Sequence, residues 1–387
     1  MVNLLLENGD LVVIEQSDFQ QLLDVLAERT YQVVGPTIRD SAIIYDEMTS
    51  YTKLPIGWTD VQGKGTYRLK RREDDALFGY TVGPHSWKKY LHPPVSYLWR
   101  TNTTADGFQV TTAIEEPPKL AFIGVRACEL QAIAAQDQVF LQGRFVDADY
   151  KARRENIFVV AVNCVQAGGT CFCASLKTGP KATSGFDLAL TEVLTGTNHY
   201  FLVEIGSSAG ADVMQAVTHQ PASPAQIEAA EALVEATTQQ MGRTLEPLDL
   251  KELLYNSYEH PQWDELGERC LGCGSCTMVC PTCFCTTTHD TIDVTGETTA
   301  HSKKWDSCFT MTFSYIHGGN VRTPLRSRYR QWLMHKFATW LDQFGRSGCV
   351  GCGRCITWCP AYIDITEEIR AIQESTNKQE EKIGGKL

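Results

Sequence analysis

The feature that most constrains this chain is a run of four closely spaced cysteines that occurs twice. The residues CLGCGSCTMVCP at 270–281 have the spacing C-x2-C-x2-C-x3-C-P, and CVGCGRCITWCP at 349–360 repeats it. Both runs carry glycines between their first three cysteines: Gly272, Gly274, Gly351 and Gly353. Three thiolates at this spacing converge on one centre only where the backbone coils tightly, and glycine permits such turns because it has no Cβ. The chain therefore contains two compact metal–thiolate motifs.

The spacing of these runs favours iron–sulfur clusters over zinc. In C-x2-C-x2-C-x3-C-P, three cysteines hold one 4Fe–4S cluster and the fourth reaches across to the other cluster. Structural zinc sites also use four cysteines, but usually as two separated C-x2-C pairs. We therefore expect two 4Fe–4S clusters with crossed ligation. The first set of ligands is Cys270, Cys273, Cys276 and Cys359, and the second is Cys349, Cys352, Cys355 and Cys280.

Composition limits the class of protein further. The formal net charge is −11, which argues against a nucleic-acid-binding protein. No apolar run approaches the roughly 20 residues that a membrane-spanning helix needs, and the N-terminal residues lack the basic segment of a signal peptide. Fifteen cysteines without a secretory signal indicate metal or redox use in a reducing compartment. We expect a cytoplasmic protein that binds neither nucleic acid nor membrane.

The chain is long enough for two or three domains. We expect an α+β fold in which N-terminal α/β lobes precede a C-terminal dicluster ferredoxin-like domain with an insertion. The expected segments are an N-terminal α/β lobe at 1–115, a second α/β lobe at 116–220, a helical linker at 221–265, the dicluster domain at 266–375 and a disordered tail at 376–387.

The second lobe contains four further cysteines at the ends of predicted strands. The apolar runs Leu120–Val125 and Ile157–Val162 are of strand length, and Glu129–Phe140 between them has helical character. Cysteines follow both strands, and a GGTCFC loop comes next. Ligands collect outside the carboxyl ends of strands in open α/β sheets. Cys128, Cys164, Cys171 and Cys173 are therefore candidates for a third 4Fe–4S site; the alternative is that they are buried, unreactive thiols.

Three more cysteines stand in the insertion between the two runs, at Cys283, Cys285 and Cys308. They allow two interpretations. One is a further cluster with a non-cysteine fourth ligand such as Asp306 or His289. The other, which we favour from sequence, is thiols packed beside the ferredoxin clusters, because three thiolates leave one iron without a ligand.

Sequence motifs for other cofactors are absent. The chain has no G-x-G-x-x-G after a strand, no G-x4-G-K-[ST] loop and no C-x-x-C-H haem attachment run. No Ser/His/Asp arrangement can be identified from spacing. We therefore expect no catalytic residues, and a chain that transfers electrons within an oxidoreductase complex.

Several stretches together resemble a known family. They occur in the order GVRACEL, GGTCFC, GFDLAL, EHPQWDE, CPTCFC, KKWDSC and CVGCGRC. The chain is similar in these stretches to the beta subunit of cytosolic NADP-linked NiFe sulfhydrogenases and, more distantly, to the electron-transfer subunit of anaerobic sulfite reductases. The likeness covers about residues 115–370. It implies an electron conduit between a flavin subunit that handles NAD(P)H and the small and large hydrogenase subunits, with clusters on the eight cysteines of the two runs.

Three functional classes follow. The first is the electron-transfer subunit of a NiFe hydrogenase, the second is the equivalent subunit of a sulfite or sulfur reductase, and the third is a redox-sensing iron–sulfur binding module. The EHPQWDE and KKWDSC stretches favour the first class over the second. A sensor has little use for two adjacent low-potential clusters, which disfavours the third.

Overall fold

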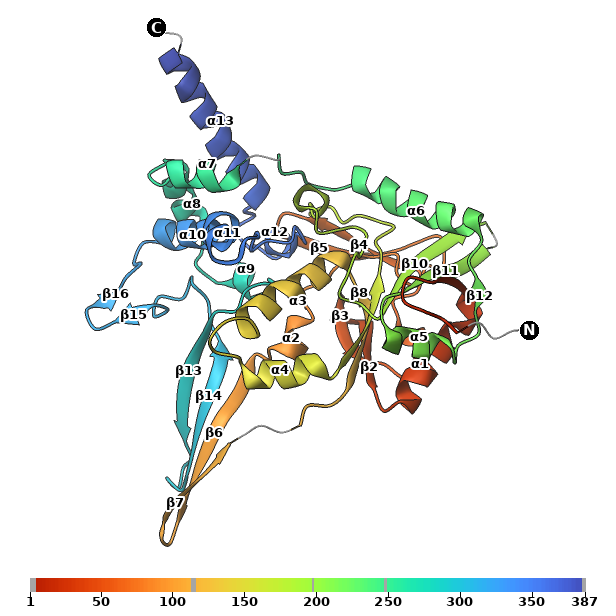
Figure 1. Ribbon diagram of the computed structural model, residues 1–387. Coiled ribbons are helices and arrows are strands. Elements are labelled where there is room, and N and C mark those ends of the chain that lie inside the picture. Colours follow the sequence, from red (N-terminus) through yellow and green to blue (C-terminus); the bar gives the residue numbers. More distant parts are fainter. Residues whose placement is uncertain (1–4, 113–115, 197, 247–248, 385–387) are drawn as a thin grey trace.

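An eight-stranded mixed sheet forms the body of the computed structural model (Figure 1). The structure describes residues 5–112, 116–196, 198–246 and 249–384. The strand order is β12-β1-β11-β10-β9-β8-β2-β3, and the central strands β10, β9, β8 and β2 run parallel. The strands are β1 (Leu11–Glu15), β2 (Gln32–Arg39), β3 (Ala42–Glu47), β8 (Leu120–Val125), β9 (Ile157–Val162), β10 (Leu188–Thr195), β11 (Asn198–Ile205) and β12 (Gln220–Pro221).

The central strands β8 and β9 are apolar throughout because helices cover both faces of the sheet. Every residue of β8 is buried, as a parallel strand between two helical layers requires. Ile123 packs into the core beneath α1 (Phe19–Glu28) and α5 (Ser208–Met214), whereas its neighbour Phe122 points into the opposite core. That second core includes residues of α3 (Ala127–Phe140) and α4 (Ala148–Glu155) together with Trp87, which precedes α2 (Lys88–Leu91).

Strands from both expected α/β lobes belong to this one sheet. The pairing of β2 with β8 aligns Val33 with Ala121, so strands from 1–115 and 116–220 share a hydrogen-bonded ladder. The boundary at 115 therefore does not separate two sheets. Local sequence cannot reveal this, because parallel pairing joins strands that lie far apart along the chain.

A second sheet projects from the body (Figure 1). Its order is β13-β14-β6-β7, so two strands of the cysteine-bearing insertion pair with two strands of the N-terminal region. The strands are β6 (Val95–Thr104), β7 (Gly107–Thr112), β13 (Thr286–Ile292) and β14 (Thr298–Trp305). Two hairpins complete the strands: β4 (Trp58–Gly63) with β5 (Thr66–Arg71), and β15 (Tyr315–Ile316) with β16 (Gly319–Asn320).

Helices surround the two cysteine runs at the C-terminal end. The connecting segment contains α6 (Pro224–Gln239), whose expected cap at Ser223 is a capping box in the structure, and α7 (Leu250–Asn256). The remaining elements are α8 (Gln262–Arg269), α9 (Ser275–Met278), α10 (Leu325–Met334), the π-helix His335–Thr339, α11 (Trp340–Phe344), α12 (Arg354–Thr357) and α13 (Ile365–Gly384). Their shared apolar core includes Trp263, Trp332 and Ile369, and six cysteines pack against it.

The structure thus has the expected α+β class, with both cysteine runs in a C-terminal helical region. The last helix continues to Gly384, so the segment 376–384 of the expected disordered tail is helical, and 385–387 lie outside the described residues. The glutamate, lysine and glutamine residues of this segment favour a helical backbone. Within the described ranges, no helix is both long enough and apolar enough to cross a membrane.

Candidate iron–sulfur centres

The two cysteine runs adopt the same local structure. In the first run Gly272 and Gly274 have φ of 62° and 74°, and in the second Gly351 and Gly353 have φ of 63° and 74°. Each run then enters a short helix, α9 or α12. The amide of Gly272 donates to Cys270 Sγ at 3.4 Å, and the equivalent amide in the second run donates to its own first cysteine at 3.4 Å. Such hydrogen bonds to sulfur favour the thiolate form of cysteine and change the reduction potential of a bound cluster.

The fourth cysteine of each run lies with the other run. Cys359 borders one cavity with the first three cysteines of the first run: Cys270, Cys273 and Cys276. Cys280 is not among the described residues that line this cavity. Burial raises the pKa of Cys355, and the neighbouring thiols of Cys349, Cys352 and Cys280 raise it further. Cys355 also borders the first cavity and lies near Cys276, so the two groups of cysteines adjoin one another.

The four cysteines of the second lobe come together as well. Cys128, Cys164, Cys171 and Cys173 line one small pocket. Its wall also contains Arg126, whose guanidinium lies 4.0 Å from Cys164 Sγ, and Met241, whose sulfur lies 4.0 Å from Cys173 Sγ. Burial raises the pKa of Cys171 to about 12, and the nearby Cys164 thiol adds to the shift. These thiols are therefore neutral in the absence of a metal, so cluster assembly here would release protons.

This third group lies directly against the second cysteine run. The amide of Phe172 donates to the carbonyl of Gly351 at 2.9 Å, and Thr178 Oγ1 donates to the carbonyl of Val350 at 2.8 Å. A Cβ on Gly351 would lie 2.6 Å from the amide nitrogen of Cys173, so only glycine fits at this contact. The GGTCFC loop and the second run therefore form a continuous structure.

A buried ion pair joins the same two regions. Glu129 on α3 and Arg354 on α12 lie 2.8 Å apart, and both side chains are 1% exposed. Tyr45 donates a hydrogen bond to Glu129, while Arg354 also donates to the carbonyls of Gly83 at 2.9 Å and His85 at 2.8 Å. This network fixes α3, which carries Cys128, against the helix that carries Cys355.

The insertion cysteines form a fourth group beside the ferredoxin pair. Cys283 lies next to Cys280, and Cys285 is hydrogen-bonded to Cys308. The pKa of Cys285 falls to about 7, because Cys308 donates to it and because Lys336 and Lys88 lie nearby.

The two expected fourth ligands lie elsewhere. His289 is exposed on β13, and the Asp306 carboxylate accepts the amide of Ser307 at 2.7 Å. Neither residue lines the cavity that the three cysteines share.

The residues that sequence reasoning missed are the charged ones around the cysteines. Arg126, Glu129, Arg354, Lys336 and Lys88 were not identified, because their partners lie far away in the chain. Only the adjacency of Arg126 and Glu129 to Cys128 could have served as a signal. Among the described residues, no three His, Cys, Asp or Glu side chains are placed to hold a single metal ion.

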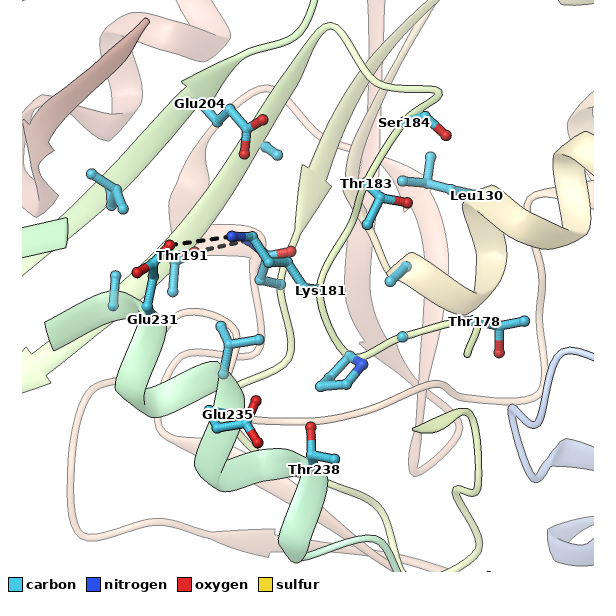
Figure 2. Close-up of a pocket in the computed structure, with 18 of the residues that line it drawn as sticks. Leu130, Thr178, Lys181, Thr183, Ser184, Thr191, Glu204, Glu231, Glu235 and Thr238 are labelled. Atoms are coloured by element: carbon cyan, nitrogen blue, oxygen red, sulfur yellow. Dashed lines mark hydrogen bonds and ion pairs between the residues drawn. The ribbon is translucent and has the colours of Figure 1, made fainter. Parts of the chain in front are cut away.

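A large cavity borders the third cysteine group (Figure 2). It has a volume of about 680 Å³ and lies between α6 and the segment 177–184. Lys181 and Glu231 form an ion pair of 3.4 Å in its wall. No cysteine is among the described residues that line it, but Gly179 in its wall lies against Cys173, because a Cβ at this position would be 3.1 Å from Cys173 Sγ.

Two cysteine runs with the same spacing and the same backbone turns define the class as an iron–sulfur protein. Residues 269–363 match the family model described as 4Fe-4S dicluster domain. The chain is also 29% identical over 324 residues to sulfhydrogenase 2 subunit beta of Pyrococcus furiosus, a match that covers 81% of this chain and 91% of that protein. The resemblance to sulfhydrogenase beta subunits noted from the sequence is thereby confirmed, and together with the 4Fe-4S domain it supports an iron–sulfur electron-transfer subunit.

Proposed function

We propose that this chain is the electron-transfer subunit of a NiFe hydrogenase complex of the sulfhydrogenase type. It would connect a flavin subunit that handles NAD(P)H with the small and large hydrogenase subunits. The observation that carries the proposal is the continuity of the cysteine groups. The third group packs on the second ferredoxin run through Phe172 and Gly351, and the second run shares its core with the first. A chain that passes electrons between two partners needs such an unbroken series.

The cysteines fit 4Fe–4S clusters at three positions. Bound clusters would supply one-electron transfer, and the chain holds the thiolates in tight glycine turns with amides directed at sulfur. We assign Cys270, Cys273, Cys276 and Cys359 to the first cluster, Cys349, Cys352, Cys355 and Cys280 to the second, and Cys128, Cys164, Cys171 and Cys173 to the third. A structure in which Cys280 and Cys270 ligate the same cluster would contradict the crossed assignment.

The third cluster is tested by iron analysis of the anaerobically purified chain. Cys171→Ser should lower the iron content by about four atoms relative to the unmodified chain, because a cubane holds four. An unchanged iron content in a folded Cys171→Ser protein would remove the third cluster from the proposal.

The proposal as a whole is tested by the proteins that accompany the chain. A tagged chain purified from its native host should bring a flavin-containing subunit and a nickel-containing hydrogenase pair, which mass spectrometry and metal analysis identify. We place this assembly in the cytoplasm, since free thiols for cluster assembly persist in reducing compartments. The isolated chain should accept electrons from dithionite and show no turnover with NADPH or hydrogen.

Other co-purifying proteins would assign a different complex. A sirohaem-containing subunit would indicate a sulfite or sulfur reductase. A chain that purifies without any redox partner would favour a sensing role.

A further inference from the structure

The insertion cysteines share a cavity that the ferredoxin pair does not use. Cys283, Cys285 and Cys308 line a cavity of about 720 Å³, which is large enough for a further cluster. Cys283 and Cys285 stand just before β13, and Cys308 stands just after β14. The antiparallel pairing of Thr286 with Trp305 therefore brings the two ends of the hairpin together.

Two buried lysines face this group. Lys336 Nζ lies 3.2 Å from Cys280 Sγ, 3.4 Å from Cys283 Sγ and 3.3 Å from Thr282 Oγ1. Lys88 Nζ donates to the carbonyl of Cys283 at 3.2 Å and lies 3.8 Å from the centre of the Trp305 ring. Each lysine is 4% exposed.

The lysines need a negative partner. Within the part of the chain that the structure describes, no carboxylate forms an ion pair with either Lys88 or Lys336. A buried ammonium group without a counter-charge is costly. Metal-bound thiolates would supply that charge. Lys336 also contacts Cys280 of the second ferredoxin set, and Cys280 lies near Lys88 as well, but the hydrogen bond of Lys88 goes to Cys283 of the insertion group.

A fourth protein ligand is available in the same cavity. His335 lines it together with the three cysteines. It begins the π-helix His335–Thr339, which interrupts the helical repeat after α10 and places His335 at the cavity while Lys336 points to the sulfurs. Single π-turns within helices are frequent at functional sites, and imidazole replaces cysteine as an iron ligand in some iron–sulfur centres.

We propose that Cys283, Cys285 and Cys308 hold a fourth iron–sulfur cluster, with His335 as the ligand of the iron that has no cysteine. This site goes beyond the three clusters of the proposed function. The neighbouring thiols belong to both ferredoxin sets, since Cys283 lies beside Cys280 and Cys308 lies near Cys276. The fourth cluster would give the ferredoxin pair a second branch.

The experiment compares iron content and EPR spectra of anaerobically purified full-length variants. Cys308→Ala should contain about four iron atoms fewer than the unmodified chain. Cys171→Ala is the matched control, because it reports the third cluster independently. A loss of iron in Cys171→Ala alone would overturn the fourth cluster and retain the third. A loss of iron in Cys308→Ala alone would retain the fourth cluster and overturn the third.

A second variant tests the site even where Cys308→Ala does not fold. His335→Ala should convert the fourth cluster to a 3Fe–4S form, visible as a new EPR signal of the oxidised protein and as the loss of about one iron atom. His289→Ala, on the exposed face of β13, should leave both measurements unchanged. Spectra of His335→Ala identical to those of the unmodified chain would overturn the assignment of His335. Full iron content in a folded Cys308→Ala protein would overturn the cluster.

Discussion

At the scale of single residues, the contact between Glu129 and Arg354 should dominate the stability of the junction between the sheet and the ferredoxin core. Glu129→Gln leaves a fully buried guanidinium without its counter-charge. Removing one partner of such a pair costs about 3–5 kcal/mol. We expect a loss of this size in the free energy of unfolding, measured by chemical denaturation of the anaerobic chain.

An exposed ion pair across the same junction provides the control. Lys64 and Glu367 lie 2.9 Å apart, with side chains 38% and 45% exposed. Glu367→Gln should cost less than about 1 kcal/mol, because water screens the pair. Equal effects of the two substitutions would contradict the importance of the buried pair.

The sequence predicted the cysteines of each group but not the charges that surround them. Spacing within one run predicts ligands because the glycine turns bring nearby residues together. The partners Glu129 and Arg354 are separated by 225 positions, and Lys336 reaches Cys283 from a different helix. No local pattern encodes such contacts, so they became visible only in the folded chain.

At the scale of elements, the two cysteine runs are alike in backbone but not in surroundings. Gly272 and Gly351 have nearly the same φ, so alanine would cost a similar strain of about 1–2 kcal/mol at either position. A Cβ at Gly272 would meet the end of the flexible Leu325 side chain at 2.7 Å. A Cβ at Gly351 would meet the backbone of Cys173, which cannot move without displacing the third group.

Substitution of these glycines should therefore have unequal results. Gly272→Ala should retain nearly all of its iron, whereas Gly351→Ala should lose iron from the second ferredoxin cluster and from the third cluster. Iron analysis and EPR of the two purified variants measure the difference. Matching iron contents would show that the loop at 170–173 does not depend on the second run.

The buried strands could be predicted from sequence, but the projecting sheet could not. Leu120–Val125 and Ile157–Val162 are strands with the expected bounds, because continuous apolar runs of this length suit a sheet covered on both faces. The strand β13 reads TTTHDTI and has no apolar alternation. The sheet also depends on pairing with β6, from the other end of the chain.

At the scale of the whole molecule, the apolar cores differ in how they depend on metal. The core beneath α1 and α5 is built from aliphatic and aromatic side chains. Six cysteines pack against the core of the helices at the C-terminal end: Cys270, Cys276, Cys308, Cys349, Cys355 and Cys359. Metal binding at such positions contributes directly to folding.

Removal of the clusters should therefore lower the local stability of the helices at the C-terminal end. In hydrogen exchange, amides of α8, α10 and α12 should lose protection in the apo protein, while amides of β8–β11 keep it. The protein with bound clusters serves as the reference. Uniform loss of protection across the main sheet would contradict this division.

The expected segments describe this molecule only in part. The order of lobes, linker and dicluster region follows the chain, but two of its sheets cross the expected boundaries. Pairing of β2 with β8 crosses the boundary at 115, and pairing of β6 with β14 joins the N-terminal region to the ferredoxin insertion. Composition along a chain indicates segments, whereas hydrogen-bonded ladders decide which segments fold together.

We propose that the cysteine groups carry electrons between two partner subunits. This electron path is tested with Cys171→Ser in the intact complex. The control is Ser184→Ala, at an exposed position of the segment that follows the third cysteine group. We predict that Cys171→Ser suppresses hydrogen-dependent NADP reduction, while each end of the complex still reacts with an artificial dye, because dyes bypass the chain. Ser184→Ala should retain the full rate. Unchanged hydrogen-dependent NADP reduction in an assembled Cys171→Ser complex would contradict a role of the third cysteine group in electron transfer.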